Sequence, residues 1–340
     1  MRKILSATVL FFISHTAISQ GLIFDSAQFA SRTSVKITRG AKPKMYSLKK
    51  YTPIVYPQVG ATCVAHSFAT ARTILAAKGL GWTDKQKITG LYFSPYYIYY
   101  RSKSNDDVNC TYGLNVEDAA RDVLKNGFAP IAAVEYPSYY PFTDNPLCMD
   151  KNGTSYPPSM QDDEDEASKY KIDEIYTVST LQQLKTALSS GMPVAVILFP
   201  PTSFSKVKSD LWTPAPGEFR DRNIMAHAVL AIGYDDTKYG GCVEIMNSWG
   251  DTWGNKGFTC IKYSDYETFF VGGYAFYMKN NDPPYQKKTA IVPKKNSTPA
   301  NRNTLHHSTV KPVTVKVKTG YGNRVTNFNN AEFIKAFEKD

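Results

Sequence analysis

This 340-residue sequence lacks long apolar stretches, and its body has little net charge. Each of these two absences excludes a class of protein. The N-terminal apolar run, residues 4–13, is too short to cross a bilayer, and no later stretch is long enough. Net charge is scarce in the body. Of the total of +10, residues 281–340 contribute +7 and Arg2 and Lys3 contribute +2, which leaves about +1 for the rest. We therefore expect no integral membrane segment in the mature chain and no nucleic-acid partner.

The first residues have the pattern of a secretory signal. Arg2 and Lys3 precede the apolar run, and Ala17-Ile18-Ser19 offers small residues for cleavage. We expect residues 1–19 to be a signal peptide and the protein to be secreted, in the periplasm or outside the cell. A retained N-terminal anchor is the alternative.

The cysteines form an odd set, and their positions are Cys63, Cys110, Cys148, Cys242 and Cys260. In an oxidising compartment four can pair and one remains. An odd cysteine in a secreted chain is either reactive or an intermolecular linker. The count therefore directs attention to the thiol with the most reactive setting.

Cys63 has such a setting, because it lies at the predicted start of a helix. Small and apolar residues run from Val64 through Ala77, Thr62 is an acceptable N-cap, and Lys78-Gly79 is a stop signal. Unpaired N–H groups and the positive dipole end of a helix favour a thiolate. From this stretch alone, a buried structural cysteine is the alternative.

Helical patterns precede strand patterns along the body. Helices begin at Ser94-Pro95 and Asn115, and a capping box of Ser179 and Gln182 predicts a helix over 180–190. The acidic run 162–166 lacks ligand spacing and indicates a solvated loop rather than a metal site. Strands are predicted at 194–199, 227–234, 242–247 and 258–263. This order favours an α+β fold with a helical half and a sheet half.

Histidine is also scarce, and this narrows the choice of a base for Cys63. Of the five histidines, His227 opens an apolar strand, where a buried polar ring needs a partner. The oxygen of Asn247 can accept the imidazole N–H and fix its tautomer. Trp249 can keep water away from that bond.

The ordered set of Cys63, His227 and Asn247-Ser248-Trp249-Gly250, followed by Trp253-Gly254, resembles the papain-family cysteine peptidases in a divergent bacterial form. The resemblance covers roughly residues 45–280. It implies a two-lobed α+β fold, with a helical N-terminal half, an antiparallel sheet or barrel in the C-terminal half, and an active-site cleft between them. It implies no metal or organic cofactor.

The resemblance also implies a role for each site residue. Cys63 is the nucleophile, His227 is the base and later the acid, and Asn247 orients the imidazole. Gln58 donates its side-chain amide to the oxyanion, beside the backbone N–H of Cys63. Trp249 shields the His227–Asn247 contact.

Several departures from the family pattern are visible. Gln58 precedes Cys63 by five residues, where the family usually has six, and His66 replaces the usual aromatic residue three positions after the nucleophile. His227 follows Cys63 by 164 residues, slightly beyond the usual spacing. A longer loop over 137–171 accounts for the excess. None of these departures removes a catalytic group.

We expect a secreted cysteine peptidase that hydrolyses peptide or protein substrates through an acyl-enzyme. One alternative is a catalytically silent papain-fold binding protein, which the shortened Gln58 loop supports. Another is a thiol acyl or glutamyl transferase. Asn247 argues against it, because such enzymes generally have an acid there.

The expected organisation has four parts. Residues 1–19 are the signal, and residues 20–44 are an N-terminal extension too short for an independently folded inhibitory prodomain. Residues 45–280 form the peptidase domain, and 281–340 form a basic linker and tail. We expect the tail to be peripheral: either a segment that binds or anchors to a surface, such as an acidic one, or a segment that is cleaved.

Two arguments select one disulfide pairing. If Asn247 faces Gly257, Cys242 and Cys260 are nearly opposite on neighbouring strands. The papain-like resemblance implies a bridge between Cys110 and Cys148. Cys63 then remains free.

Overall fold

Two units make up the chain, Met1–Tyr285 and Gln286–Asp340. The computed structural model describes residues 21–37, 40–58, 60–107, 112–132, 164–219, 226–279, 315–316 and 327–328. In the second unit, β11 (Val315–Lys316) pairs antiparallel with β12 (Asn327–Phe328). The cysteines Cys110 and Cys148 lie outside the described residues, so their predicted bridge stays a prediction.

A long buried helix, α2, is central to the first unit. It is buried from its first residue through Ala77, and its own side chains are mostly small or apolar on every side of the helix. The helices are α1 (Ser26–Ser31), α2 (Cys63–Gly79), α3 (Lys85–Gly90), α4 (Pro95–Ser102), α5 (Val116–Asn126), α7 (Leu181–Ser189) and α8 (Tyr263–Phe269). Single 3-10 turns are η1 (Lys49–Tyr51), η3 (Thr202–Lys206) and η4 (Lys238–Gly240). Each of these helices is too short or too polar to cross a membrane.

Two of the predicted helix starts are confirmed by their capping bonds. Ser94 accepts from the N–H of Tyr97 at the start of α4, and Asn115 accepts from the N–H of Glu117 at the start of α5. The predicted capping box was one residue too early. Thr180 is the N-cap of α7, and the N–H of Ser179 donates to Gln183 Oε1.

A mainly antiparallel sheet forms the other half of the first unit. Its order is β4-β10-β5-β7-β8-β9-β6, with β2 paired to β7; among the described strands of this sheet, β6 and β9 pair parallel and the other pairs are antiparallel. Its strands are β2 (Met45–Ser47), β4 (Glu174–Val178), β5 (Val194–Leu198), β6 (Leu211–Trp212), β7 (His227–Asp235), β8 (Cys242–Met246), β9 (Phe258–Lys262) and β10 (Phe270–Tyr277). A separate parallel pair joins β1 (Leu22–Ile23) to β3 (Leu114–Asn115). The α+β class is confirmed, and the sheet as described does not close into a barrel.

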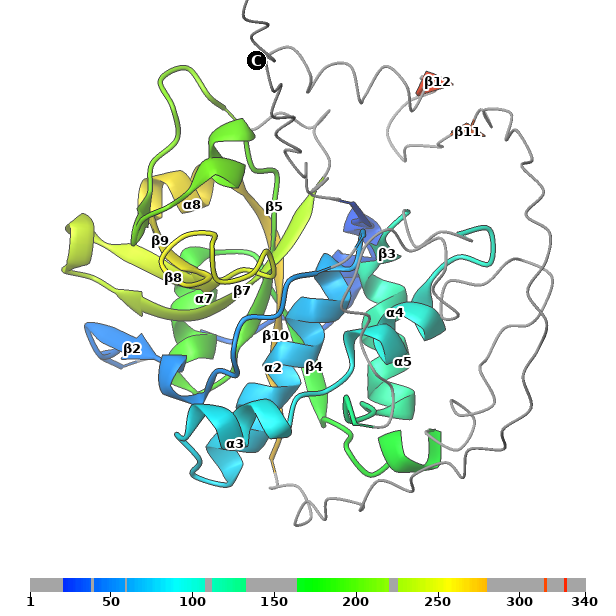
Figure 1. Cartoon of the computed structure of the whole chain (residues 1–340). Helices are drawn as coiled ribbons and strands as arrows, with labels where there is room; N and C mark the ends of the chain where they lie inside the picture. The colour runs from blue at the N-terminus through cyan, green and yellow to red at the C-terminus, as the bar shows by residue number, and fades with distance from the viewer. Residues whose placement is uncertain are drawn as a thin grey trace, which may run out of the picture. The chain divides into compact units, whose positions relative to one another are not determined.

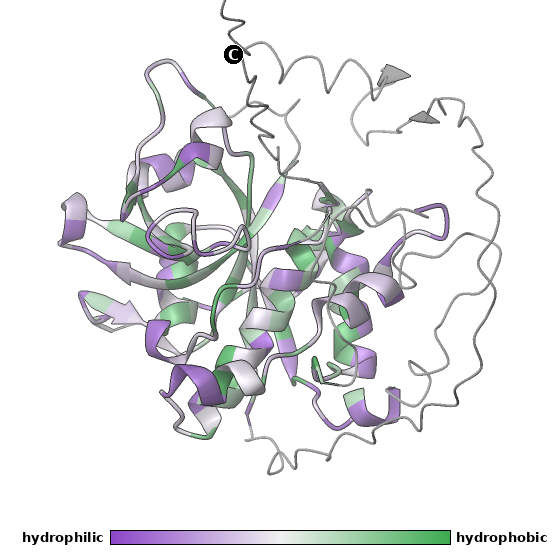
Figure 2. Cartoon of the chain, in the orientation of Figure 1, coloured by the Kyte–Doolittle hydropathy of each residue, from purple (hydrophilic) through white to green (hydrophobic). Residues whose placement is uncertain are grey.

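The helices and the sheet share one hydrophobic core. Figure 1 shows α2 in the middle, with α4 and α5 on one side and the strands β5, β7 and β10 on the other. Figure 2 shows hydrophobic colour along these inner strands and hydrophilic colour on outer elements such as α3. The core residues come from both halves. The N-terminus of α2 is therefore held against β7, the strand that begins with His227.

The β8–β9 hairpin has the register expected from the sequence. The N–H of Asn247 donates to the carbonyl oxygen of Gly257 at 2.9 Å. Cys242 is paired with Lys262, and Cys260 with Glu244, so the two cysteines are offset by two residues on one face. The structure holds both as free thiols, so the predicted disulfide is not present in it. A hydrogen bond between the thiols raises the pKa of Cys242 and lowers that of Cys260.

Candidate active site

Cys63 is the first residue of α2, as the sequence predicts. Thr62 occupies the N-cap position, and the Cys63 side chain is fully buried. Burial raises the pKa of the Cys63 thiol, while backbone N–H groups near the sulfur, first that of Ala228, lower it by less. In this conformation desolvation therefore outweighs the helix dipole, and the sulfur is a thiol rather than the expected thiolate.

The N-terminal segment covers this sulfur. The thiol donates to the carbonyl oxygen of Gly21 at 3.7 Å, and the next two residues form β1 against β3. Gly113, just before β3, has φ +77, and a Cβ there would lie 2.0 Å from the same Gly21 oxygen. Only glycine lets the two backbones approach this closely.

Further along, the segment is anchored to both halves of the unit. Arg32 pairs with the buried carboxylate of Glu117 on α5 at 2.7 Å. The ring of Phe29 packs edge-on against Tyr274 of β10, and the N–H of Val35 donates to Thr177 at the end of β4. Residues 21–35, which lie within the expected N-terminal extension, thus pack against both halves of the first unit.

His227 and Asn247 form the hydrogen-bonded pair that the sequence predicts. His227 Nε2 donates to Asn247 Oδ1 at 2.8 Å, and both side chains are buried. The N–H of Ser248 donates to the same oxygen at 2.8 Å, which fixes the orientation of the amide. With the proton on Nε2, Nδ1 is the basic nitrogen of the ring. Burial lowers the pKa of His227 to about 4, although the Asn247 bond raises it, so the ring is neutral at pH 7.

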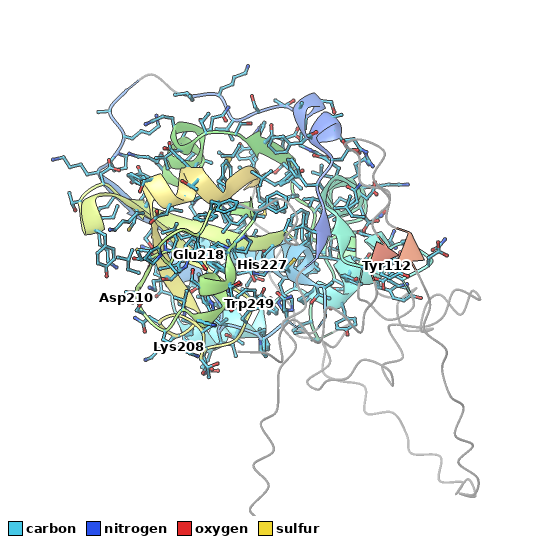
Figure 3. The ribbon with its side chains drawn as sticks, turned by 90° about the horizontal axis from the view of Figure 1, so that it is seen from above. Tyr112, Lys208, Asp210, Glu218, His227 and Trp249 are labelled. Carbon is cyan, nitrogen blue, oxygen red and sulfur yellow. The ribbon has the colours of Figure 1, made fainter. Side chains whose placement is uncertain are left out.

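An aromatic cluster encloses this pair. Trp249 stacks on the His227 ring with centroids 4.5 Å apart, and Phe204 of η3 meets both rings edge-on. Phe204 is held in turn, because its carbonyl oxygen accepts from Trp253 Nε1 at 2.8 Å. Figure 3 shows His227 and Trp249 close together, with Tyr112 on the side of the helices. The shielding of the pair involves Phe204 as well, which the sequence analysis missed because no local pattern connects η3 to β7.

Gln58 is tied to the motif that contains Asn247. Ser248 Oγ donates to Gln58 Oε1 at 2.7 Å, and the N–H of Gln58 donates to the Ser248 carbonyl oxygen at 2.6 Å. Gln58 Nε2 donates to the carbonyl oxygen of Gly60 at 2.9 Å. The amide donor is therefore directed to the loop that leads into Cys63, despite the shorter spacing.

The structure thus brings together the predicted residues from three segments. Gln58 contacts Ser248, His227 contacts Asn247, and Cys63 contacts the backbone of β7 at Ala228. The sulfur forms its side-chain hydrogen bond with Gly21, and among the described residues His227 Nδ1 has no hydrogen-bond partner. Among the described residues, no cluster of three or more His, Cys, Asp or Glu side chains has the geometry to hold a metal ion. The chemistry available is that of a thiol, an imidazole and an amide.

Comparison with solved structures gives the same architecture. Xylellain, a cysteine protease from Xylella fastidiosa, matches with a TM-score of 0.62 and 22% identity, over 77% of this chain and 97% of that one. Bromelain from Ananas comosus matches with a TM-score of 0.52 and 17% identity, over 70% of this chain and all of that one. ProCathepsin B S9 from Trypanosoma congolense matches with a TM-score of 0.57 and 18% identity, over 77% and 87%. At these identities the likeness shows the fold.

Comparison with protein-family profiles shows the family to which this chain belongs. The sequence profile described as papain family cysteine protease matches residues 102–279, which is more than half of the chain. This range contains His227 and Asn247, while Cys63 and Gln58 precede it. The chain belongs to the papain family of cysteine proteases.

Proposed function

We propose that this protein is a secreted cysteine peptidase that hydrolyses peptide bonds with Cys63, His227, Asn247 and Gln58. The observation that supports it most is the buried His227–Asn247 pair under Trp249, beside the start of the helix that Cys63 opens. This is the arrangement that a thiol nucleophile needs: a base near the sulfur, and a group that orients the base.

In the first half of the reaction, His227 Nδ1 takes the proton of Cys63, and the thiolate attacks the peptide carbonyl carbon. Asn247 keeps the proton of the ring on Nε2 and accepts its hydrogen bond. The tetrahedral intermediate collapses as the C–N bond breaks, and the imidazolium returns its proton to the leaving amine. The product that remains is a thioester on Cys63.

The negative oxygen of the intermediate needs donors already in place. The N–H of Cys63 is one, since the first N–H groups of a helix have no partner within the helix. Gln58 Nε2 is the other, and the bond from Ser248 to Gln58 Oε1 holds this amide. In the second half, His227 deprotonates a water molecule that attacks the thioester, and the acid product leaves with the thiol restored.

Export is the other part of the proposal, and it is based on the N-terminal sequence. Cleavage after Ser19 leaves a chain that begins at Gln20, one residue before the carbonyl that covers Cys63. The mature protein then still carries the covering segment, so uncovering of the sulfur is a separate event.

The experiment is hydrolysis of a peptide library by the purified mature protein and its variants. Cys63→Ala and His227→Ala should abolish hydrolysis, while Asn247→Ala should retain a small fraction of it. The matched control is Cys242→Ala with Cys260→Ala, which removes two buried thiols outside the site and should retain activity. Hydrolysis that survives in Cys63→Ala would refute the proposal. Peptide binding without cleavage would indicate a silent binding protein, and amine incorporation a transferase.

A further inference from the structure

The side-chain amide of Asn247 has hydrogen-bond partners for its oxygen but, among the described residues, none for its nitrogen. Its oxygen accepts two hydrogen bonds, from His227 and from the N–H of Ser248. Its nitrogen Nδ2 is buried, and no acceptor among the described residues forms a hydrogen bond with it. Buried amide nitrogens in native proteins almost always have a protein or water partner.

A small cavity lies beside this amide. One turn of α2 lines one side with His66, Ser67 and Thr70, and the facing side includes Leu230, Asn247 and Ser248. About 10 Å³ of it is open to the centre of a water molecule, which is room for one. Most of these side chains are polar, and a buried water typically needs two to four polar partners.

His66 is unusual among the cavity residues because its ring titrates. It is 2% exposed, and its Nδ1 lies 3.4 Å from the hydroxyl of Tyr92, which lies 3.2 Å from Thr70 Oγ1. Burial lowers the pKa of His66 to about 3, so the ring is neutral at pH 7. A neutral imidazole keeps one donating and one accepting nitrogen, which suits a bridging water.

We propose that one water molecule in this cavity joins Asn247 Nδ2 to His66, which makes His66 a positioning residue for the His227–Asn247 pair. The inference rests on the proposed function only for its effect on catalysis. The water accepts from Nδ2, so that rotation of the amide would break this bond as well as the bond to His227. His66 thus helps to keep Oδ1, rather than Nδ2, toward the imidazole.

The direct test is a crystal structure of the full-length protein at a resolution that shows ordered water. Density for one water within hydrogen-bond distance of both Asn247 Nδ2 and His66 is the expected result. An empty cavity, or a water that contacts only one of them, would overturn the proposal. This readout needs no catalytic turnover.

Three variants test the effect on the site. His66→Phe retains a ring of similar size and removes both nitrogens, and His66→Gln restores a donor and an acceptor. The matched control is Thr73→Val: this buried polar residue further along α2 donates to the Ala69 carbonyl oxygen, accepts from the N–H of Phe93 and does not line the cavity, so its replacement also removes buried hydrogen bonds but away from Asn247. With concentrations set by active-site titration, His66→Phe should lower kcat about 3- to 10-fold, the loss expected for roughly one hydrogen bond, with KM nearly unchanged. His66→Gln should recover most of it, and Thr73→Val should behave as wild type.

A spectroscopic readout separates this proposal from the proposed function. The proton NMR signal of His227 Nε2–H should exchange with water several-fold faster in His66→Phe than in wild type, even in protein that hydrolyses no peptide. Unchanged exchange, or an equal loss of kcat in His66→Gln and His66→Phe, would show that His66 only fills space. Failure of the proposed function alone would remove the kinetic readout and leave the exchange result intact.

Discussion

The contact between Gly21 and Gly113 offers a way to uncover Cys63 without deleting any residue. A Cβ at position 113 would lie 2.0 Å from the Gly21 oxygen and 2.5 Å from its carbonyl carbon. Both are backbone atoms, so the covering strand must move. The oxygen that moves is the one that accepts from the Cys63 thiol. Gly113→Ala should therefore expose the sulfur.

The size of the effect follows from the backbone pairing that holds residues 21–23 next to Cys63. β1 pairs with β3 over only two residues, Leu22 with Leu114 and Ile23 with Asn115. About two backbone hydrogen bonds at a net 0.5–1.5 kcal/mol each correspond to ~1–3 kcal/mol. Residues 21–23 of the wild-type protein are then displaced in roughly 0.6–15% of molecules, and their loss should speed alkylation of Cys63 roughly 6- to 160-fold. Access of water also relieves the burial that raises the pKa of the thiol, which acts in the same direction.

The assay is the rate of alkylation by iodoacetamide, followed by mass spectrometry of the peptide that contains Cys63. A small reagent avoids any effect of the new methyl group on peptide binding. Gly81→Ala is the matched control, because Gly81 has φ +66 and nothing within 4 Å of its added Cβ. It carries the same backbone strain, about 1–2 kcal/mol, without the clash.

The two variants together decide the outcome. A folded Gly113→Ala protein that alkylates Cys63 no faster than Gly81→Ala would show that Gly21 does not cover the sulfur in solution. Fast alkylation in wild type would show the same. Either result would show that the contact with Gly21 does not limit access to Cys63.

Three further predictions concern stability and the tail. The pKa values of His66 and His227 are lowered to about 3 and about 4, so the unfolded chain binds protons that the folded chain does not. The free energy of unfolding should therefore fall as pH drops below about 6.5, by about 2 kcal/mol per histidine at pH 5. Urea unfolding at pH 7 and pH 5 should show a smaller fall in His66→Phe than in wild type, and an equal fall would contradict this. Oxidised glutathione should join Cys242 to Cys260 by thiol–disulfide exchange and stabilise the protein by about 3 kcal/mol, with peptide mapping as the check; two alkylatable thiols after oxidation would refute it. A chain truncated after Lys279 should fold and hydrolyse peptides normally, and loss of cooperative thermal unfolding would show that the tail completes the domain.

Local signals predicted the starts of two helices and the register of the β8–β9 hairpin. The starts of α4 and α5 follow from Ser94 and Asn115, whose side chains cap the helices as expected. The hairpin register follows from placing Asn247 opposite Gly257. These features depend on residues a few positions apart, where hydrogen-bond geometry restricts the choice.

The strand β10 was missed because its sequence does not have a strand pattern. Gly272 and Gly273 interrupt the apolar run, and glycine is depleted in strands. The structure gives the reason for Gly272: a Cβ there would lie 2.9 Å from the ring of Phe29. The glycine makes room for a residue about 240 positions earlier in the chain, and no local pattern contains that information.

A second long-range contact, between Cys63 and Gly21, explains why the state of Cys63 was not predicted. A helix start favours a thiolate, but burial under Gly21 raises the pKa of the thiol, and burial lowers that of His227 to about 4. Both changes disfavour the ion pair that attack on a peptide requires, and both have the same cause, the exclusion of water. Departure of residues 21–23 would reverse the effect at the sulfur and open a path for substrate in one step. In this structure residues 21–23 therefore lower both the accessibility and the reactivity of Cys63, and the alkylation rates of Gly113→Ala and Gly81→Ala test whether they do so in solution.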